Sequence, residues 1–315
     1  MLIPHTFSHY PARRMIVLAL GIVFALTACA QTTPTPDHTT LRVLAVESFL
    51  ADIAQNVAGD RAQIQTLMPL GVDPHSFEPT PQDIKNVADS KVLIVNGAGF
   101  EEFLTKLLEN THSQAIVIEA SKGLTSRTLK PDEPHDEDNP VDPHFWLDPT
   151  KTIAYVENIR DGLTKADPAG AAVYRANADA YIAKLNALDA QIKNAVSAIP
   201  PERRKLVTDH DTLGYYADRY GFEIVGMLVP SFSTADSGTA QQLAALTNKI
   251  RASGARAIFV EHNDNPRMAQ QIAQEAGVRV VAGLYTHSLS DADGPAPTYL
   301  KMLEHNTQLI VDALK

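Results

Sequence analysis

Residues 167–201 read DPAGAAVYRANADAYIAKLNALDAQIKNAVSAIPP and predict one long helix. Asp167-Pro168 has the form of an N-cap followed by a proline at the first helical position. After Gly170 no helix-breaking residue intervenes before Pro200-Pro201. About 30 residues at about 1.5 Å each make a rod of roughly 45 Å, which suits a strut along two domains. Its buried face is expected from apolar residues at three- or four-residue spacing, namely Leu185, Leu188, Ile192, Val196 and Ile199.

Short apolar segments alternate with helical patterns on both sides of this rod, which is typical of βαβ units and parallel sheets. The two halves also contain similar segments, since ADSKVLIVN (88–96) is similar to SGARAIFVE (253–261). The sequence therefore predicts an α/β fold of two Rossmann-like parallel-sheet lobes joined by one long rigid α-helix. Strands are expected at 41–46, 63–68, 91–95, 115–118, 205–208, 222–229, 257–260 and 278–281, and helices at 49–58, 81–88, 100–108, 212–220, 239–252, 267–276 and 299–314. The predicted domains are an N-terminal lobe at 41–150, a linker with the long helix at 151–203, and a C-terminal lobe at 204–315.

The first 40 residues have the features of an export signal followed by a tether. Arg13 and Arg14 precede the apolar run Ile16–Leu26, which is shorter than the roughly 20 residues that span a bilayer. Residues 1–28 are therefore predicted to be a secretory signal peptide. The segment Leu26-Thr27-Ala28-Cys29 resembles the lipobox of bacterial lipoproteins, in which the cysteine is lipidated. Residues 29–40 would then form a lipidated flexible tether. The alternative is that Cys29 merely precedes a different cleavage site.

Composition narrows the class of protein further. The 315 residues are 44% hydrophobic and 20% charged, which is ordinary for globular domains. The net charge is −10 and no basic patch stands out, so we expect no nucleic-acid partner. Cys29 is the only cysteine, which excludes an intrachain disulfide. No later segment reaches 18 consecutive apolar residues, so the mature chain is expected to be soluble apart from its anchor.

Four of the eleven histidines lie in distinctive loops. His75 lies in GVDPHSFEP, after a predicted strand, and His144 lies in DPHFWLDP, beside the only tryptophan. His210 follows a strand in TDHDTLGYY, and His287 lies in LYTHSL, past the last strand. Taken alone, His75 and His287 are also explained as surface loop histidines. His144 is also explained as a core histidine satisfied by Asp142 or Asp148, and His210 as a helix-capping or solvent-exposed histidine. Together they would complete a tetrahedral Zn²⁺ shell, which leaves no position for an activated water and so favours binding over catalysis.

Other polar residues are weaker candidates. Glu261 and His262 follow a strand, and Asp291 lies near His287, so these three are possible orienting partners or alternative ligands. Asp293 could also supply an oxygen ligand. The acidic loop 131–140, which contains His135, could attract cations but is more simply a solvated loop. His112 and His305 are predicted to lie at or in helices, without a ligand role.

The chain resembles the zinc and manganese solute-binding proteins of ABC transporters, the ZnuA/TroA-like family, over essentially all of residues 41–315. The resemblance implies two lobes, a rigid linking helix, one metal ion between the lobes, and delivery to a permease with its ATPase. It also implies a protein outside the cytoplasm, attached to the cell membrane through Cys29, and a monomer. The resemblance rests on GVDPHSFEPTPQD (71–83), DPHFWLDP (142–149), TDHDTLGYYADRYG (208–221), FVEHNDNPRMAQQIAQEAGV (259–278) and LYTHSLSDADGPAPTYLKML (284–303).

The resemblance carries the ligand role to His75, His144 and His210. The fourth ligand of the family is commonly a carboxylate, especially Asp, and His287 stands at that position here. Since Mn²⁺ prefers oxygen ligands, a nitrogen-rich shell favours Zn²⁺, with Mn²⁺ as the alternative. Because the long helix should restrict hinge closure, metal release would involve smaller movements of the binding loops. The rival hypotheses are a zinc hydrolase with Glu261 as general base, and a surface adhesin, a role ascribed to some family members.

Overall fold

In the computed structural model of the protein, the described residues are 2, 41–111, 113–128, 141–234, 238–263 and 265–315. The predicted tether with Cys29, and all of the predicted signal peptide except Leu2, lie outside them. His112 and the whole of the acidic loop 131–140, including His135, also lie outside them. The fold below is that of residues 40–315, which form one compact unit.

The first lobe contains a four-stranded sheet in which every strand pair is parallel. Its strand order is β2-β1-β3-β4, so the second strand along the chain lies at one edge and the fourth at the other. The predicted helix at 100–108 begins later, at Leu104, because Glu101 accepts hydrogen bonds from the backbone of Asn96 and Gly97 and holds a loop there. The elements are β1 (Leu41–Ala45), α2 (Ser48–Ala58), β2 (Ala62–Thr66), α3 (Pro81–Asp89), β3 (Val92–Val95), α4 (Leu104–Thr111) and β4 (Ile116–Glu119).

The second lobe repeats this topology with the strand order β6-β5-β7-β8, again all parallel. The similarity between residues 88–96 and 253–261 corresponds to this repeat, because β3 and β7 hold the same place in their two sheets. The two parallel sheets and the long helix confirm the predicted fold class. The elements are β5 (Lys205–Thr208), α7 (Gly214–Tyr220), β6 (Glu223–Met227), α8 (Ala240–Ser253), β7 (Ala257–Glu261), α9 (Arg267–Ala276), β8 (Arg279–Leu284) and α10 (Tyr299–Leu314).

Local sequence signals set several of the helix ends. Thr80 and Asp83 form a capping box at the start of α3, and Thr239 and Gln242 form another at the start of α8. Each box satisfies backbone N–H groups that a first helical turn leaves without partners. Gly254 ends α8 with φ +73°, a left-handed conformation that glycine adopts without strain. These ends were therefore predictable to within a residue or two.

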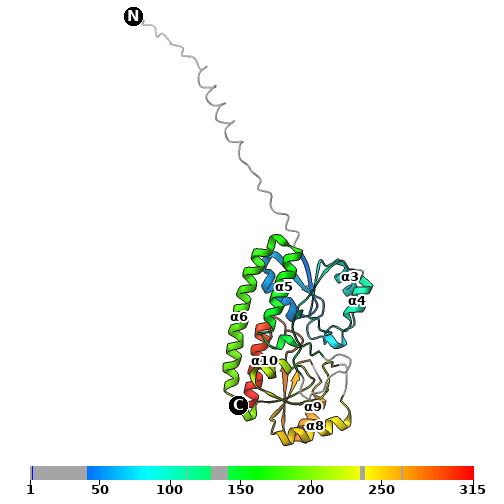
Figure 1. Ribbon diagram of the computed structural model, residues 1–315, viewed down its shortest axis with the longest axis vertical. Helices are drawn as coiled ribbons and strands as arrows, with labels where there is room; N and C mark the ends of the chain where they lie inside the picture. Colours follow the sequence, from blue (N-terminus) through cyan, green and yellow to red (C-terminus); the bar gives the residue numbers. More distant parts are fainter. Residues whose placement is uncertain (1, 3–40, 112, 129–140, 235–237, 264) are drawn as a thin grey trace. The chain divides into compact units, whose positions relative to one another are not determined.

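The long helix α6 spans Ala171–Ser197, and its 27 residues extend for about 40 Å. It packs against α2 and α5 of the first lobe and against α7 and α10 of the second, and Figure 1 shows it running alongside both. The predicted N-cap role of Asp167 is wrong. A 3₁₀ turn at Pro168–Gly170 intervenes, and Asp167 instead accepts hydrogen bonds from Arg61 Nη2 (2.6 Å) and from the Tyr174 hydroxyl (2.7 Å).

A second helix, α5 (Thr152–Ala166), precedes α6 within the range predicted to be linker. It packs against α2 and β4 as well as α6. Its apolar face was not singled out in the sequence, although Tyr155, Val156, Ile159 and Leu163 are all buried. The first lobe is thus covered by a pair of antiparallel helices, of which α6 continues to the second lobe (Figure 1). No helix among the residues described here combines the length and apolarity that crossing a bilayer requires.

We expect Leu185→Ala in α6 to lower the free energy of unfolding by about 2–5 kcal/mol, because Leu185 is fully buried and its loss leaves a cavity. Gln191→Ala, on the exposed side of the same helix, is the matched control and should change it by less than about 0.5 kcal/mol. Urea denaturation followed by circular dichroism measures both. Equal effects in the two variants would contradict the packing of α6 described above.

Candidate metal centre

Each of the four candidate histidines is positioned by a different segment. His75 lies in a 3₁₀ turn, Pro74–Ser76, which follows β2. His144 immediately precedes another 3₁₀ turn, Phe145–Leu147. His210 lies two residues beyond the end of β5, and His287 lies three residues beyond the end of β8. Three of the four therefore follow the carboxyl ends of parallel strands, where open α/β sheets bind ligands.

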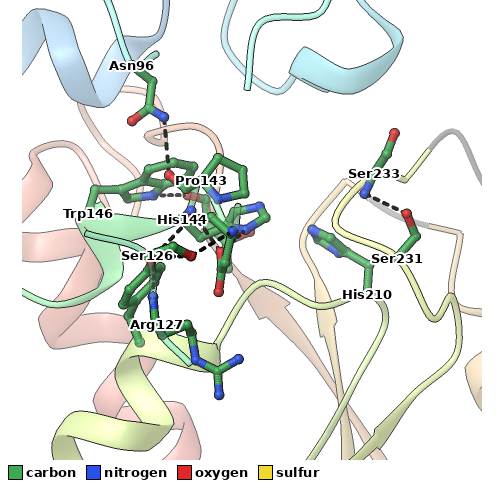
Figure 2. A network of polar contacts seen from close by, with 12 residues as sticks. Asn96, Ser126, Arg127, Pro143, His144, Trp146, His210, Ser231 and Ser233 are labelled. Carbon is green, nitrogen blue, oxygen red and sulfur yellow. Dashed lines mark hydrogen bonds and ion pairs between the residues drawn. The ribbon is translucent and has the colours of Figure 1, made fainter. Parts of the chain in front are cut away.

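The four rings converge in the interior. Their ring centroids lie between 5.0 and 6.1 Å apart. One nitrogen from each ring lies within 4.8 Å of the other three. Nε2 of His144 is 3.3 Å from Nε2 of His287, while Nε2 of His75 and of His210 are buried without a hydrogen-bond partner from the protein. In Figure 2 the His210 ring points across from the second lobe toward the segment that carries His144. These distances would allow all four imidazoles to share one cation.

Carboxylates hydrogen-bond to two of the rings at Nδ1, and the carboxyl group of Glu261 lies close to a third ring without a hydrogen bond at its nearer oxygen. Asp142 Oδ1 lies 3.0 Å from Nδ1 of His144, and Asp209 Oδ1 lies 3.2 Å from Nδ1 of His210. Glu261 Oε1 lies 3.0 Å from Nδ1 of His287. In His144 and His210 the hydrogen-bonded carboxylate favours the proton on Nδ1 and leaves Nε2 as the electron-pair donor.

Backbone hydrogen bonds fix the carboxylates in turn. Asp142 Oδ1 also accepts from the His144 N–H at 3.0 Å, and Asp209 Oδ1 accepts from the His210 N–H at 2.9 Å. Asp209 Oδ2 accepts from the Glu261 N–H at 2.8 Å, which ties the β5 and β7 ends together. The sequence predicted an acidic neighbour for His144, and it predicted that Glu261 could orient a ligand. It did not single out Asp209. The adjacency of Asp209 to His210 was the available signal.

His75 is held differently. Its own N–H donates to Asp73 Oδ1 at 3.0 Å, and Pro74 restricts the backbone between them. The Thr234 hydroxyl, from the second lobe, donates to the other oxygen of Asp73. The turn that carries His75 is therefore fixed both locally and from across the lobes.

Aromatic side chains enclose the cluster on one side. The Phe100 ring lies edge-on to His75 at 5.1 Å and stacks on His287 at 5.6 Å. Trp146 lies 5.2 Å from His144, and its Nε1–H donates to the Thr286 carbonyl at 2.7 Å. That bond joins the first lobe to the loop that carries His287. Phe100 was expected only as part of a helix, and nothing in its local sequence signalled this contact.

Burial and mutual proximity change how the histidines bind protons. Burial, followed by the nearby His287 and His210 rings, holds the pKa of both His75 and His144 well below the usual 6.5. Burial also lowers the pKa of His210, but the hydrogen bond and charge of Asp209 outweigh it, and the net pKa is raised. Burial, followed by the charge of Asp209, raises the pKa of Glu261 well above its usual 4.5. His75 and His144 therefore favour the neutral form, whereas His210, in the second lobe, binds a proton more readily.

The remaining candidates lie elsewhere. His262 stacks on Tyr285 with 4.0 Å between ring centroids, and it lines a separate surface pocket with Asp291 and Asp293. The structure therefore does not bring His262 or Asp291 to the four-histidine cluster. His305 is in α10 and its Nε2 lies 2.9 Å from the Gly283 carbonyl oxygen.

Two parallel-sheet lobes with a buried, nitrogen-rich donor set between them define a two-lobed binding protein with a site suited to a transition-metal cation. Residues 43–313 match the protein family described as "ZnuA: Zinc-uptake complex component A periplasmic". The chain belongs to this family of metal-binding substrate-binding proteins of ABC transporters.

Individual relatives cover almost the whole chain. The manganese-binding lipoprotein MntA from Halalkalibacterium halodurans is 32% identical over 95% of this chain and 97% of its own length. The manganese-bound periplasmic metal binding protein from Candidatus Liberibacter asiaticus superposes with a TM-score of 0.77 at 31% identity, covering 88% of this chain and 100% of that one. The periplasmic zinc binding protein TroA from Treponema pallidum gives a TM-score of 0.80 at 26% identity, covering 87% and 99%. The names of these three proteins describe metal binding.

We expect Asp209→Asn to lower the pKa of His210 in the metal-free protein, because the carboxylate that chiefly opposes the effect of burial is then lost. In the unaltered protein the His210 ring should take up its proton above pH 6.5, whereas His75 and His144 should stay neutral below it. Proton and nitrogen NMR titration of the imidazoles measures all three. An unchanged His210 pKa in the variant would show that Asp209 does not control this ring.

Proposed function

We propose that this protein captures Zn²⁺ between its lobes and delivers it to the permease and ATPase of an ABC importer. The proposed ligands are His75, His144, His210 and His287. The observation that carries the proposal is the set of four buried imidazoles, each with a nitrogen within 4.8 Å of the others. Four nitrogen ligands complete the tetrahedral shell that Zn²⁺ prefers. We further propose that the protein acts as a monomer.

The choice of Zn²⁺ rests on the donor atoms. Mn²⁺ is harder and favours carboxylate and water ligands, whereas imidazole suits Zn²⁺. The carboxylates of Asp142, Asp209 and Glu261 contact the Nδ1 side of the rings, which supports a role in orienting imidazoles rather than in binding the ion. Capture of Mn²⁺ or another divalent metal is the second candidate, because relatives with the same fold are named for manganese.

A hydrolase is the less favoured alternative. It would need an open coordination position and a free general base. Four histidine ligands would fill the shell, and Glu261, the predicted general base of a hydrolase, lies against Nδ1 of His287. We therefore propose a binding role without catalysis.

The ligand assignment predicts the outcome of metal analysis. Protein purified without added metal should hold one equivalent of Zn²⁺ and should prefer it over Mn²⁺ in competition. His75→Ala or His144→Ala should weaken Zn²⁺ affinity by more than about 100-fold, since loss of a ligand exceeds the usual effect of losing an orienting partner. Isothermal titration with competing chelators measures these affinities.

Two further variants sharpen this test. His305→Ala removes a histidine outside the cluster and should leave Zn²⁺ affinity unchanged. His287→Asp replaces a nitrogen donor by oxygen and should shift the preference toward Mn²⁺. If Zn²⁺ affinity and stoichiometry were unaffected by His75→Ala and His144→Ala, the proposed site would be wrong.

We propose that Cys29 carries the lipid anchor and that the protein works outside the cytoplasm, attached to the membrane. The lipobox-like sequence before Cys29 and the naming of relatives as lipoproteins support this. Multiple acyl chains hold a protein stably to a bilayer. Cys29→Ser should therefore move the protein from the membrane fraction to the soluble extracytoplasmic fraction, as measured by fractionation and immunoblotting. Retention of the variant on membranes would contradict the anchor.

A further inference from the structure

One surface pocket of the first lobe contains a proposed metal ligand in its wall. Its volume is about 450 Å³, and it is formed by the His75 loop, α3 and the α4 region. His75 is 9% exposed, whereas His144, His210 and His287 are 0–3% exposed. The pocket thus reaches the most exposed of the four histidines, although the Nε2 atom of His75 is itself buried.

The seam between the lobes, by contrast, is closed by hydrogen bonds around the cluster. Both backbone polar groups of Gly71 bind the second lobe. Its N–H donates to Ser288 Oγ (2.9 Å), and its carbonyl accepts from Asn263 Nδ2 (3.1 Å). The pocket beside this seam contains none of the four histidines. Further bonds cross the seam from Trp146 to Thr286 (2.7 Å), from Tyr215 to Asp142 (2.8 Å), from Leu289 to Ser48 (2.9 Å) and from Thr234 to Asp73.

The charges of the first-lobe pocket suit a cation. Glu78 and Glu102 are exposed carboxylates in its wall, and Lys106 is a single opposing cation. Its remaining surface is largely apolar, with Phe77 and Phe103 in edge-on contact at 5.0 Å. Fixed charges in a low-dielectric pocket raise the local concentration of ions of opposite sign and their association rate.

We propose that metal ions reach and leave the cluster through this first-lobe pocket, which we call the access pocket. His75 is the first imidazole that an incoming ion meets, and Glu78 and Glu102 draw the ion in. Lys106 opposes them. The proposal rests on the proposed metal-binding function and extends it, because metal exchange then needs no separation of the lobes.

The association and dissociation rates of the metal distinguish a residue of the access pocket from a metal ligand. Residues that stabilise an ion in the access pocket lower the barrier in both directions, so their loss slows association and does not speed dissociation. Loss of a ligand has the opposite effect on dissociation, which becomes faster. Trp146 is the only tryptophan and lies 5.2 Å from His144, so its fluorescence is a direct probe of loading.

The test is stopped-flow mixing of Zn²⁺ with metal-free, full-length protein, with dissociation followed by chelator chase. The double variant Glu78→Gln, Glu102→Gln should associate about fivefold more slowly at low ionic strength, with the difference shrinking at high salt. Lys106→Gln should associate faster. In neither variant should dissociation speed up.

Two controls make the result decisive. Asp60→Asn with Glu157→Gln changes the net charge of the chain equally at exposed sites outside the access pocket, and its association rate should match the unaltered protein. Asp291→Asn with Asp293→Asn tests the seam pocket as a rival route. The proposed route is wrong if the double variant Glu78→Gln, Glu102→Gln binds Zn²⁺ at the unaltered rate or releases it faster. It is also wrong if association slows no more in this variant than in either control. If the unaltered protein takes up no metal, the proposed function itself fails.

Discussion

Four imidazoles packed with donor nitrogens within 4.8 Å of one another are the constraint on which this structure depends. Buried imidazolium ions so close together would repel each other and would lack solvation, so most of these rings must be neutral. The lowered pKa values of His75 and His144 express that requirement. Hydrogen bonds to Asp142 and Asp209 then place the proton of His144 and His210 on Nδ1 and leave Nε2 of each ring as the electron-pair donor.

The rest of the fold brings these rings together and keeps them there. The parallel sheets supply strand ends at which polar loops gather, and the repeated strand order places such ends in both lobes. The helix α6 contacts both lobes, and Trp146 binds the Thr286 carbonyl across the seam, directly beside His287. A ring displaced by about 1 Å would no longer match tetrahedral distances, so this stiffness serves the site.

Much of this arrangement follows from local sequence, and the remainder follows from contacts that local sequence does not contain. Periodicity predicted the alternation of strands and helices, and the run without helix breakers predicted α6. The histidine loops stood out because strand ends and prolines surround them. Asp167 was misread because Asp-Pro is a strong capping signal locally, whereas Arg61, over 100 residues away, binds its carboxylate. Phe100 was missed for the same reason, since its importance depends on partners from other segments, whereas Asp209 was missed although its main partner, His210, is the next residue.

In the proposed site the atoms that would bind the metal and the nearest acidic group belong to different residues. In the family pattern a carboxylate commonly serves as the fourth ligand, and it supplies both an oxygen donor and a negative charge beside the ion. In the proposed site His287 would supply nitrogen, and the nearest carboxyl group lies one group further out, with Glu261 Oε1 3.0 Å from Nδ1. Burial raises the pKa of Glu261 well above its usual value, so it tends to hold a proton in the absence of a cation. A dication held at the centre of the proposed site would favour its ionised form through the intervening imidazole. The negative charge would then develop as the ion binds, while the donor atoms would remain those that favour a borderline metal over a hard one.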